Sequence, residues 1–362
     1  MTAGDETPTS VGIVGVGVVG RRCARLLDGR HRLMLHDRRD EAAQAAAGVL
    51  RDARVVADVA DLASCATVVL AHPGEHVDVA DQLLRLGVHV VSLAGSVGRV
   101  QALLDLDDVA RQHGTGIVVG AAMSPGLSGL LARWLASELA TCDEIHVATH
   151  GTAGPSCARE HHRALGSSAT GWHDGTWIER RGGSGRELCW FPEPVGAYDC
   201  YRADLAEPTT LHRALPNVTR ISARVSATRR DRFTSWLPML TPPHREGGVG
   251  ALRVEARGAR ADGGRATLIA GIAERVGTAS GATAAAFADA AARGRLPRGA
   301  AVAGDAALPT VELLQSVAEG GVRMQRFTGV PESLARQEDR DAPPADRPLP
   351  KGSPAPRATR RP

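Results

Sequence analysis

A glycine-rich turn near the N-terminus constrains the fold of this chain more than any other feature. Residues 10–20 read SVGIVGVGVVG, an apolar run typical of a buried strand followed by glycines at GxGxxG spacing. Gly15 would permit a tight turn, Gly17 would let the backbone approach a pyrophosphate, and Gly20 would let the next helix pack close to the strand. The pattern therefore predicts a strand–turn–helix unit that binds a dinucleotide at the helix N-terminus.

Strand-like and helix-like segments alternate through the first third of the chain. Alternation of this kind is typical of a parallel, doubly wound sheet with right-handed crossovers. The expected strands are 11–16, 32–36, 53–56, 67–70, 88–93 and 116–119, and the expected helices are 20–27, 41–49, 75–86 and 100–113.

An acidic residue stands where the second strand of such a sheet ends. Asp37 comes 17 residues after Gly20, and a carboxylate there can accept both ribose hydroxyls of NAD and repel a 2′-phosphate. Arg38 and Arg39 follow, and an arginine there can pair with the phosphate of NADP. We expect NAD or NADP as cofactor, with NAD favoured. The residues expected to contact the cofactor are Gly15, Gly17, Val18, Val19, Gly20, Asp37, Arg38, His72, Pro73, Leu93 and Ala94.

The pattern changes after residue 126. The later strand-like segments alternate apolar and polar residues, which favours a second α+β domain built on an antiparallel sheet with one wet face. Residues 151–217 are rich in Gly, Pro, His and Trp, and we expect mostly loops there. The expected organisation is a flexible lead over 1–10, an NAD(P)-binding Rossmann domain over 11–127 completed by about 278–330, a substrate and dimerisation domain over 128–277, and a disordered tail over 331–362.

Composition excludes several functional classes. No apolar run reaches the ~18 residues of a membrane span, and basic residues do not cluster with aromatic ones as in nucleic-acid-binding proteins. The six cysteines are scattered without a CxxC pair, so we expect reduced thiols in the cytoplasm and no metal site. The only lysine is Lys351, which makes lysine-based catalysis in the core improbable.

Three further segments carry a resemblance. Residues 120–128 read GAAMSPGLS, residues 172–177 read WHDGTW, and residues 191–218 contain FPEP, EPTTL and LPNV in that order. Together with the glycine turn, these segments resemble the saccharopine dehydrogenase-like family of NAD(P)-dependent reductases, including its carboxynorspermidine synthase-type members. The resemblance covers roughly residues 11–330. It implies a two-domain cleft, a homodimer and an amino-acid or keto-acid substrate.

The chain departs from that family near the expected cleft. Saccharopine-forming members carry a Cys and an Asp just before the Pro-Gly turn, where this chain has Ala121 and Ser124. Where many members have Asp at the end of the fifth strand, this chain has Ser92. The resemblance therefore supports the cofactor domain more strongly than saccharopine as substrate.

Two histidines are candidate proton donors. His72 follows the fourth strand, where ligands bind in doubly wound sheets, and it could act through its imidazole or contact the cofactor only through its backbone. His150 closes the first strand of the second domain. We interpret His76 as a helix-start residue. The residues expected to contact substrate are Met123, Ser124, Arg159, Arg163 and Trp172.

The sequence therefore predicts hydride transfer to or from an imine or carbonyl carbon of an amino-acid or keto-acid derived substrate. Two alternatives stay open. The chain could be a catalytically inactive nucleotide-sensing or partner-binding protein on the same fold, as the missing Cys and Asp would allow. It could also be an amino-acid dehydrogenase of the diaminopimelate type, which shares the two-domain plan.

Overall fold

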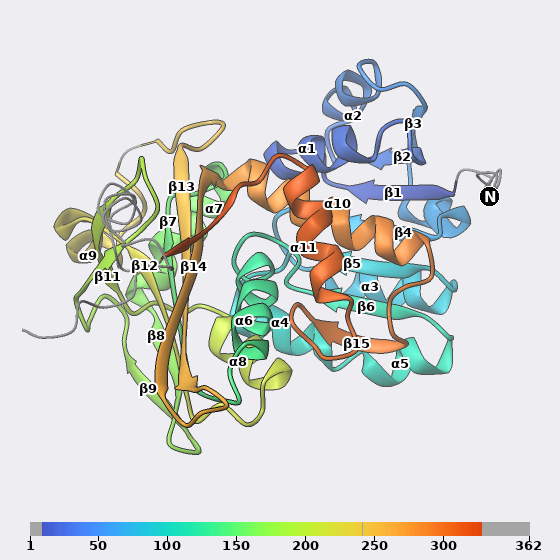
Figure 1. Ribbon diagram of the computed structural model, residues 1–362. Helices are drawn as coiled ribbons and strands as arrows, with labels where there is room; N and C mark the ends of the chain where they lie inside the picture. The colour runs from blue at the N-terminus through green and yellow to red at the C-terminus, as the bar shows by residue number, and fades with distance from the viewer. Residues whose placement is uncertain (1–8, 241, 328–362) are drawn as a thin grey trace, which may run out of the picture. The chain divides into compact units, whose positions relative to one another are not determined.

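Seven parallel strands form the first sheet of the computed structural model, which describes residues 9–240 and 242–327 (Figure 1). Their order is β15-β6-β5-β4-β1-β2-β3, so the strand order reverses between β1 and β4. The predicted doubly wound parallel sheet is confirmed. The strands are β1 (Ser10–Val14), β2 (Arg32–His36), β3 (Ala53–Val55), β4 (Thr67–Leu70), β5 (His89–Ser92), β6 (Gly116–Val119) and β15 (Gly299–Val302).

Helices cover this sheet on both faces. Every residue of β4, β6 and β15 is therefore buried. Helix α10 packs along α1 and across β1, β4 and β5, while α5 packs against β6 and β15. The single helix expected over 100–113 is two helices, α4 and α5. The helices are α1 (Val18–Leu27), α2 (Asp40–Ala47), α3 (Val77–Arg85), α4 (Val97–Leu104), α5 (Asp107–Gln112), α10 (Val276–Ala292) and α11 (Thr310–Glu319), with the 3-10 helix η1 (Val59–Ser64).

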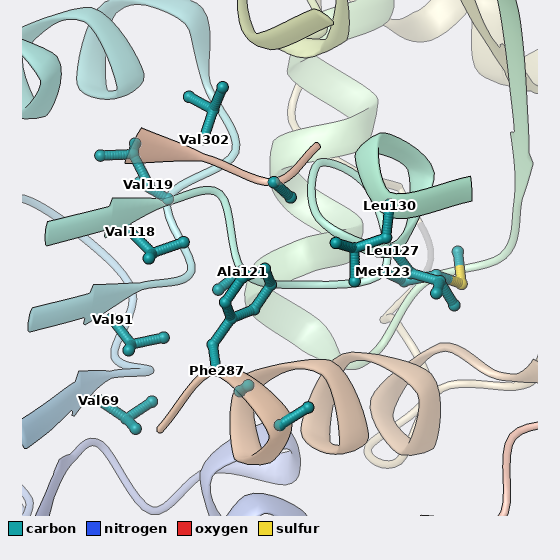
Figure 2. Close-up of a cluster of buried hydrophobic side chains, with 14 of the residues drawn as sticks. Val69, Val91, Val118, Val119, Ala121, Met123, Leu127, Leu130, Phe287 and Val302 are labelled. Carbon is teal, nitrogen blue, oxygen red and sulfur yellow. The ribbon is translucent and has the colours of Figure 1, made fainter. Parts of the chain in front are cut away.

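Segments far apart in the sequence build one hydrophobic core. Phe287 of α10 is fully buried, and Figure 2 shows its ring beside Ala121, close to side chains from the parallel strands. Leu127 and Leu130 of the next helix, α6 (Leu127–Ser137), belong to the same cluster. Burial of these side chains fixes the segment 120–126, which leads from the first sheet to the second.

The second sheet has nine strands and is mostly antiparallel, as predicted, although β7 and β12 pair in parallel. Helix α6 packs against β13 and β14, and helix α8 (Glu207–Ala214) packs against β12. The strands are β7 (Thr141–His150), β8 (Ser168–His173), β9 (Thr176–Arg181), β10 (Glu187–Trp190), β11 (Ala197–Tyr201), β12 (Arg220–Ser226), β13 (Val249–Ala259), β14 (Arg265–Arg275) and β16 (Met324–Phe327).

Residues 151–217 contain more regular structure than the sequence analysis expected. Pro155 opens helix α7 (Pro155–Gly166), because proline at the first helical position needs no N–H partner. Asp174 and Gly175 both have positive φ and close the β8–β9 hairpin, as an Asp-Gly turn does. A further short helix, α9 (Arg229–Thr234), follows β12. The expected tail over 331–362 lies outside the described residues.

A hydrogen-bonded aspartate, Asp289, attaches α10 to His31, the residue before β2. Asp289 Oδ1 lies 2.8 Å from His31 Nε2, and its other oxygen lies 3.0 Å from Arg293 Nε. Burial alone would raise the pKa of Asp289, but His31 and Arg293 outweigh burial and lower it. The folded state therefore favours the ionised carboxylate.

We expect Asp289→Ala to lower the free energy of unfolding by about 1–3 kcal/mol at neutral pH, because buried His31 loses its partner. This contribution is present above the ordinary pKa of an aspartate and is lost as pH falls through the lowered pKa of the folded protein. Urea unfolding at pH 7 and below pH ~4 measures it. Asp289→Asn keeps an acceptor for His31 and is the control. Equal stability of the alanine variant and the wild type at pH 7 would contradict the prediction.

Candidate functional site

The glycine turn between β1 and α1 has the geometry of a phosphate-binding turn. Gly15 has φ +94°, and a Cβ there would lie 2.5 Å from the backbone nitrogen of His72. A Cβ at Gly20 would clash with the carbonyl oxygen of Gly15, so the helix packs close to the turn. At Gly17 the added Cβ meets no atom of the described residues within 4 Å. Gly17 therefore faces open space at the start of α1, whose first turn carries no acidic residue.

This open space belongs to a cleft of about 1050 Å³ between the carboxyl ends of the parallel strands and the second sheet. It lies at the point where the strand order reverses, which is where ligands bind in doubly wound folds. Thirteen of the residues expected to contact cofactor or substrate line it. They are Gly15, Gly17, Val18, Val19, Asp37, Arg38, His72, Pro73, Leu93, Ala94, Met123, Ser124 and Arg159.

Four of the expected site residues lie elsewhere. The side chain of Thr149 lines the cleft, so His150, the next residue of β7, points to the opposite face of the second sheet. There its Nδ1 lies 2.8 Å from Ser226 Oγ. Arg163 is exposed on α7, and Trp172 packs against His212 while its Nε1 donates to Val218 O. Gly20 lies behind the turn, where it sets the close approach of α1.

Asp37 lies at the rim of the cleft, beside the glycine turn. Its Oδ2 accepts a hydrogen bond from Val16 N at 2.9 Å, and its Oδ1 accepts one from Arg39 N at 3.0 Å. Each carboxylate oxygen has a second lone pair, so both remain able to accept from a ligand hydroxyl. Arg38 and Arg39 line the same rim.

Two histidines and a serine form a hydrogen-bonded network at the loop after β4, in which His76 and Ser92 are buried and His72 is half-buried. His72 Nε2 donates to Glu75 O at 3.2 Å, and His76 Nε2 donates to His72 O at 2.9 Å. His76 Nδ1 then accepts from Ser92 Oγ at 2.8 Å, which fixes its tautomer. Burial lowers the pKa of His72 and, together with His72 and Arg99, lowers that of His76 to about 4. Both rings are therefore neutral at pH 7.

A buried carboxyl group that the sequence analysis missed lies across the cleft. Glu207, the first residue of α8, is 1% exposed, and its Oε1 accepts a hydrogen bond from Ser124 Oγ. Its Oε2 is buried and has no hydrogen-bond partner among the described residues. Burial raises the pKa of Glu207, and the hydrogen bond from Ser124 offsets only part of that rise. Nothing local in the sequence indicates this burial, because the surrounding side chains come from other elements.

Cys157 and His161 on α7 were also missed as a pair. They lie four residues apart, on the same face of the helix, and both line the cleft. Burial alone would raise the pKa of the Cys157 thiol, but His161 outweighs burial and lowers it. Burial alone would lower the pKa of His161, but Cys157 and the nearby Glu160 and Glu207 raise it. The spacing Cys-x-x-x-His after Pro155 was the signal that could have identified them.

The part of the chain that the structure describes contains neither a metal-binding cluster nor a membrane-spanning helix. Over residues 9–240 and 242–327 the His, Cys, Asp and Glu side chains form no group of three that could bind a metal ion. Within those same ranges, no helix is both long enough and apolar enough to cross a membrane.

Comparison with known proteins identifies a solved structure that has the same fold. No family model and no curated protein sequence matches the chain. Among solved structures, saccharopine dehydrogenase (L-Glu forming) from Saccharomyces cerevisiae matches with a TM-score of 0.67 at 14% identity, over 88% of this chain and 100% of that one.

GenD2 from gentamicin A biosynthesis, in complex with NAD, matches with a TM-score of 0.46 at 17% identity, over 91% of this chain and 99% of that one. A variant of meso-diaminopimelate dehydrogenase from Clostridium tetani E88 scores 0.47 at 14% identity, over the same shares. Of these three, the yeast enzyme alone has a score that indicates a common fold. The chain therefore has the fold of saccharopine dehydrogenase, with its own set of side chains in the cleft.

Proposed function

We propose that this protein is an NAD(P)-dependent oxidoreductase that transfers hydride to or from an imine or carbonyl carbon. The observation that carries the proposal is the turn at Gly15 and Gly17, which opens on the cleft with Asp37 beside it. Gly17 offers the room that a pyrophosphate needs, and the N-terminus of α1 stabilises its charge. The shared fold with saccharopine dehydrogenase agrees with this assignment.

The proposed cofactor site uses residues that follow the ends of four strands, β1, β2, β4 and β5. Gly15, Gly17 and the start of α1 would hold the pyrophosphate, and Asp37 would accept hydrogen bonds from the adenosine ribose. The loops at His72-Pro73 and Leu93-Ala94 line the same cleft and would hold the nicotinamide. When bound, the cofactor supplies or accepts the hydride. The residues of the chain orient the reacting carbon and exclude water.

A proton must also be held near the reacting carbon. His72 lines the cleft, but its lowered pKa leaves it mostly neutral at pH 7. Glu207 has a raised pKa and a free oxygen, so it keeps a proton to higher pH than an ordinary glutamate. We therefore propose Glu207, positioned by Ser124, as the group that gives or takes the proton. The proposed mechanism does not use His150, Arg163 or Trp172.

Fluorescence titration with NADH and NADPH, followed by turnover assays on amino acids, amines, aldehydes and oxo acids, tests the function. We expect binding of at least one nucleotide at micromolar concentration and turnover of one carbonyl or amine substrate. Binding without turnover over the whole panel would favour the inactive nucleotide-sensing alternative. If neither nucleotide binds, the oxidoreductase proposal is wrong.

We expect Asp37→Ala to weaken NADH binding about 10-fold, because hydrogen bonds from the ribose to a carboxylate are lost. NADPH binding should weaken less or improve, since the carboxylate no longer repels a 2′-phosphate. The measurement is the ratio of the two dissociation constants. Asp40→Ala removes an exposed acid three residues away, at the start of α2, and is the matched control. An unchanged ratio in Asp37→Ala would show that Asp37 does not select the cofactor.

A further inference from the structure

The cleft contains a thiol that the proposed hydride transfer does not require. Cys157 is the third residue of α7, so it lies in the first turn, where the helix N-terminus stabilises negative charge. His161 lies one turn further along the same face, and both side chains line the cleft. A cysteine at a helix N-terminus beside a histidine is the environment in which thiols ionise at neutral pH.

Three other cysteines of the chain, Cys23, Cys65 and Cys142, have the opposite environment. Burial raises the pKa of Cys23 to about 12 and that of Cys65 to about 11. Cys142 is partly exposed, as Cys157 is, yet burial and Asp143 raise its pKa to about 11. The contrast between the pKa values of Cys142 and Cys157 therefore reflects their neighbours, Asp143 and His161, more than exposure to solvent.

Glu207 is the second observation that indicates a ligand at this site. It is almost completely buried, it lines the same cleft, and its Oε2 has no partner among the described residues. An unsatisfied buried oxygen costs free energy unless a ligand group completes its hydrogen bonding. A protonated carboxyl group can donate that hydrogen bond to a carbonyl oxygen, as donors do in an oxyanion hole.

We propose that Cys157 adds covalently to the carbonyl carbon of an aldehyde in the cleft, with His161 as the base and Glu207 as the donor to the carbonyl oxygen. The sulfur–carbon bond forms as the π electron pair of the carbonyl moves to its oxygen. The proton that the thiol gave to His161 returns to that oxygen, which leaves a hemithioacetal. No electron leaves the pair of reactants, so no oxidant is needed.

The aldehyde class follows from the shape and chemistry of the site. A thiolate adds more readily to an aldehyde than to a ketone, because one substituent of the carbon is only hydrogen. Cys157 is half-buried and Glu207 is almost completely buried, so the space between them favours that smaller group. This inference about Cys157 rests on the proposed function, because the aldehyde would be the part of the substrate that enters the cleft beside the cofactor.

Alkylation of the full-length protein by iodoacetamide between pH 6 and pH 9, read by peptide mass spectrometry, tests the thiol. At pH 6.5 we expect Cys157 to react at least about 10-fold faster than Cys142, the matched control within the same molecule. In His161→Asn the pH midpoint for Cys157 should move upward. Equal rates at Cys157 and Cys142, or an unmoved midpoint in His161→Asn, would overturn the proposal.

Propanal tests the carbonyl chemistry in the same assay. Incubation with propanal should slow alkylation of Cys157 at least about 10-fold, gel filtration should restore it, and 1-propanol should have no effect. Glu207→Met lacks the donor, so propanal should protect Cys157 less while iodoacetamide, which needs no donor, still reacts. Absence of protection by propanal in the wild type would show that the thiol does not capture an aldehyde.

NADH fluorescence measured on the wild type and on Cys157→Ser separates this inference from the proposed function. Both proteins should bind NADH, because Cys157 is assigned to the carbonyl and not to the cofactor. If NADH binds and Cys157 is unreactive, the inference fails while the proposed function stands. If NADH does not bind and Cys157 still captures propanal, the proposed function fails and the thiol site stands.

Discussion

Replacing Gly17 with leucine is expected to weaken NADH binding at least about 100-fold, a loss of about 2.7 kcal/mol, while the protein stays folded. A Cβ at Gly17 meets no described atom within 4 Å, so the leucine side chain extends into the cleft where a pyrophosphate would approach. The backbone there has φ −69°, which any residue adopts. The free energy of unfolding should therefore change by only about 1 kcal/mol, the cost of leucine at a helix N-cap.

Gly98→Leu is the matched control for that experiment. Gly98 lies in the first turn of α4, outside the cleft, and an added Cβ there also meets open space. It should leave NADH binding unchanged, as measured by fluorescence titration. NADH binding by Gly17→Leu with near wild-type affinity would exclude this turn as the pyrophosphate site.

Gly15→Ala is expected to cost about 3 kcal/mol or more of stability and to abolish nucleotide binding. Two penalties add at this position. A φ of +94° is unfavourable for alanine, and the new Cβ would lie 2.5 Å from the backbone nitrogen of His72. Since backbone atoms cannot move aside as a flexible side chain can, the turn and the loop after β4 must separate. Urea unfolding and NADH titration measure the two effects.

Gly74→Ala separates the two penalties. Gly74 has φ +109°, but a Cβ there meets nothing among the described residues within 4 Å. It should therefore cost only the backbone strain, about 1–2 kcal/mol. If Gly15→Ala and Gly74→Ala lose the same stability, the close approach of the turn to His72 contributes nothing.

The first sheet could be predicted from the sequence because its signals are local. Each strand is a short apolar run, and the connections between strands contain helices. The glycine motif lies within eleven consecutive residues. Asp37 could be placed for the same reason, since it directly follows a strand that pairs with β1. Strand β15 was not predicted, because only its pairing with β6 identifies it.

The other half of the cleft depends on contacts that no local pattern contains. Glu207 is buried because Ser124, 83 residues earlier, meets it across the cleft. Successive residues of a strand face opposite sides of the sheet, so a prediction that is off by one residue selects the wrong face. Thr149 therefore lines the cleft in place of the neighbouring His150. Trp172 was expected in the pocket, but an indole that packs on His212 and donates to a backbone carbonyl is already satisfied.

The late position of α10 and β15 in the chain has a consequence for biosynthesis. Strand β6 and the face of the sheet beside α1 are completed only by residues 276–302, which leave the ribosome after strands β7 to β14 of the second sheet. Until then the nascent chain exposes an unpaired strand edge and an apolar surface, both of which promote aggregation. The half of the fold that carries the first sheet therefore cannot mature as an independent N-terminal unit. A ribosome that stalls before residue 276 releases a chain that holds the complete glycine turn without α10, the helix that packs along α1.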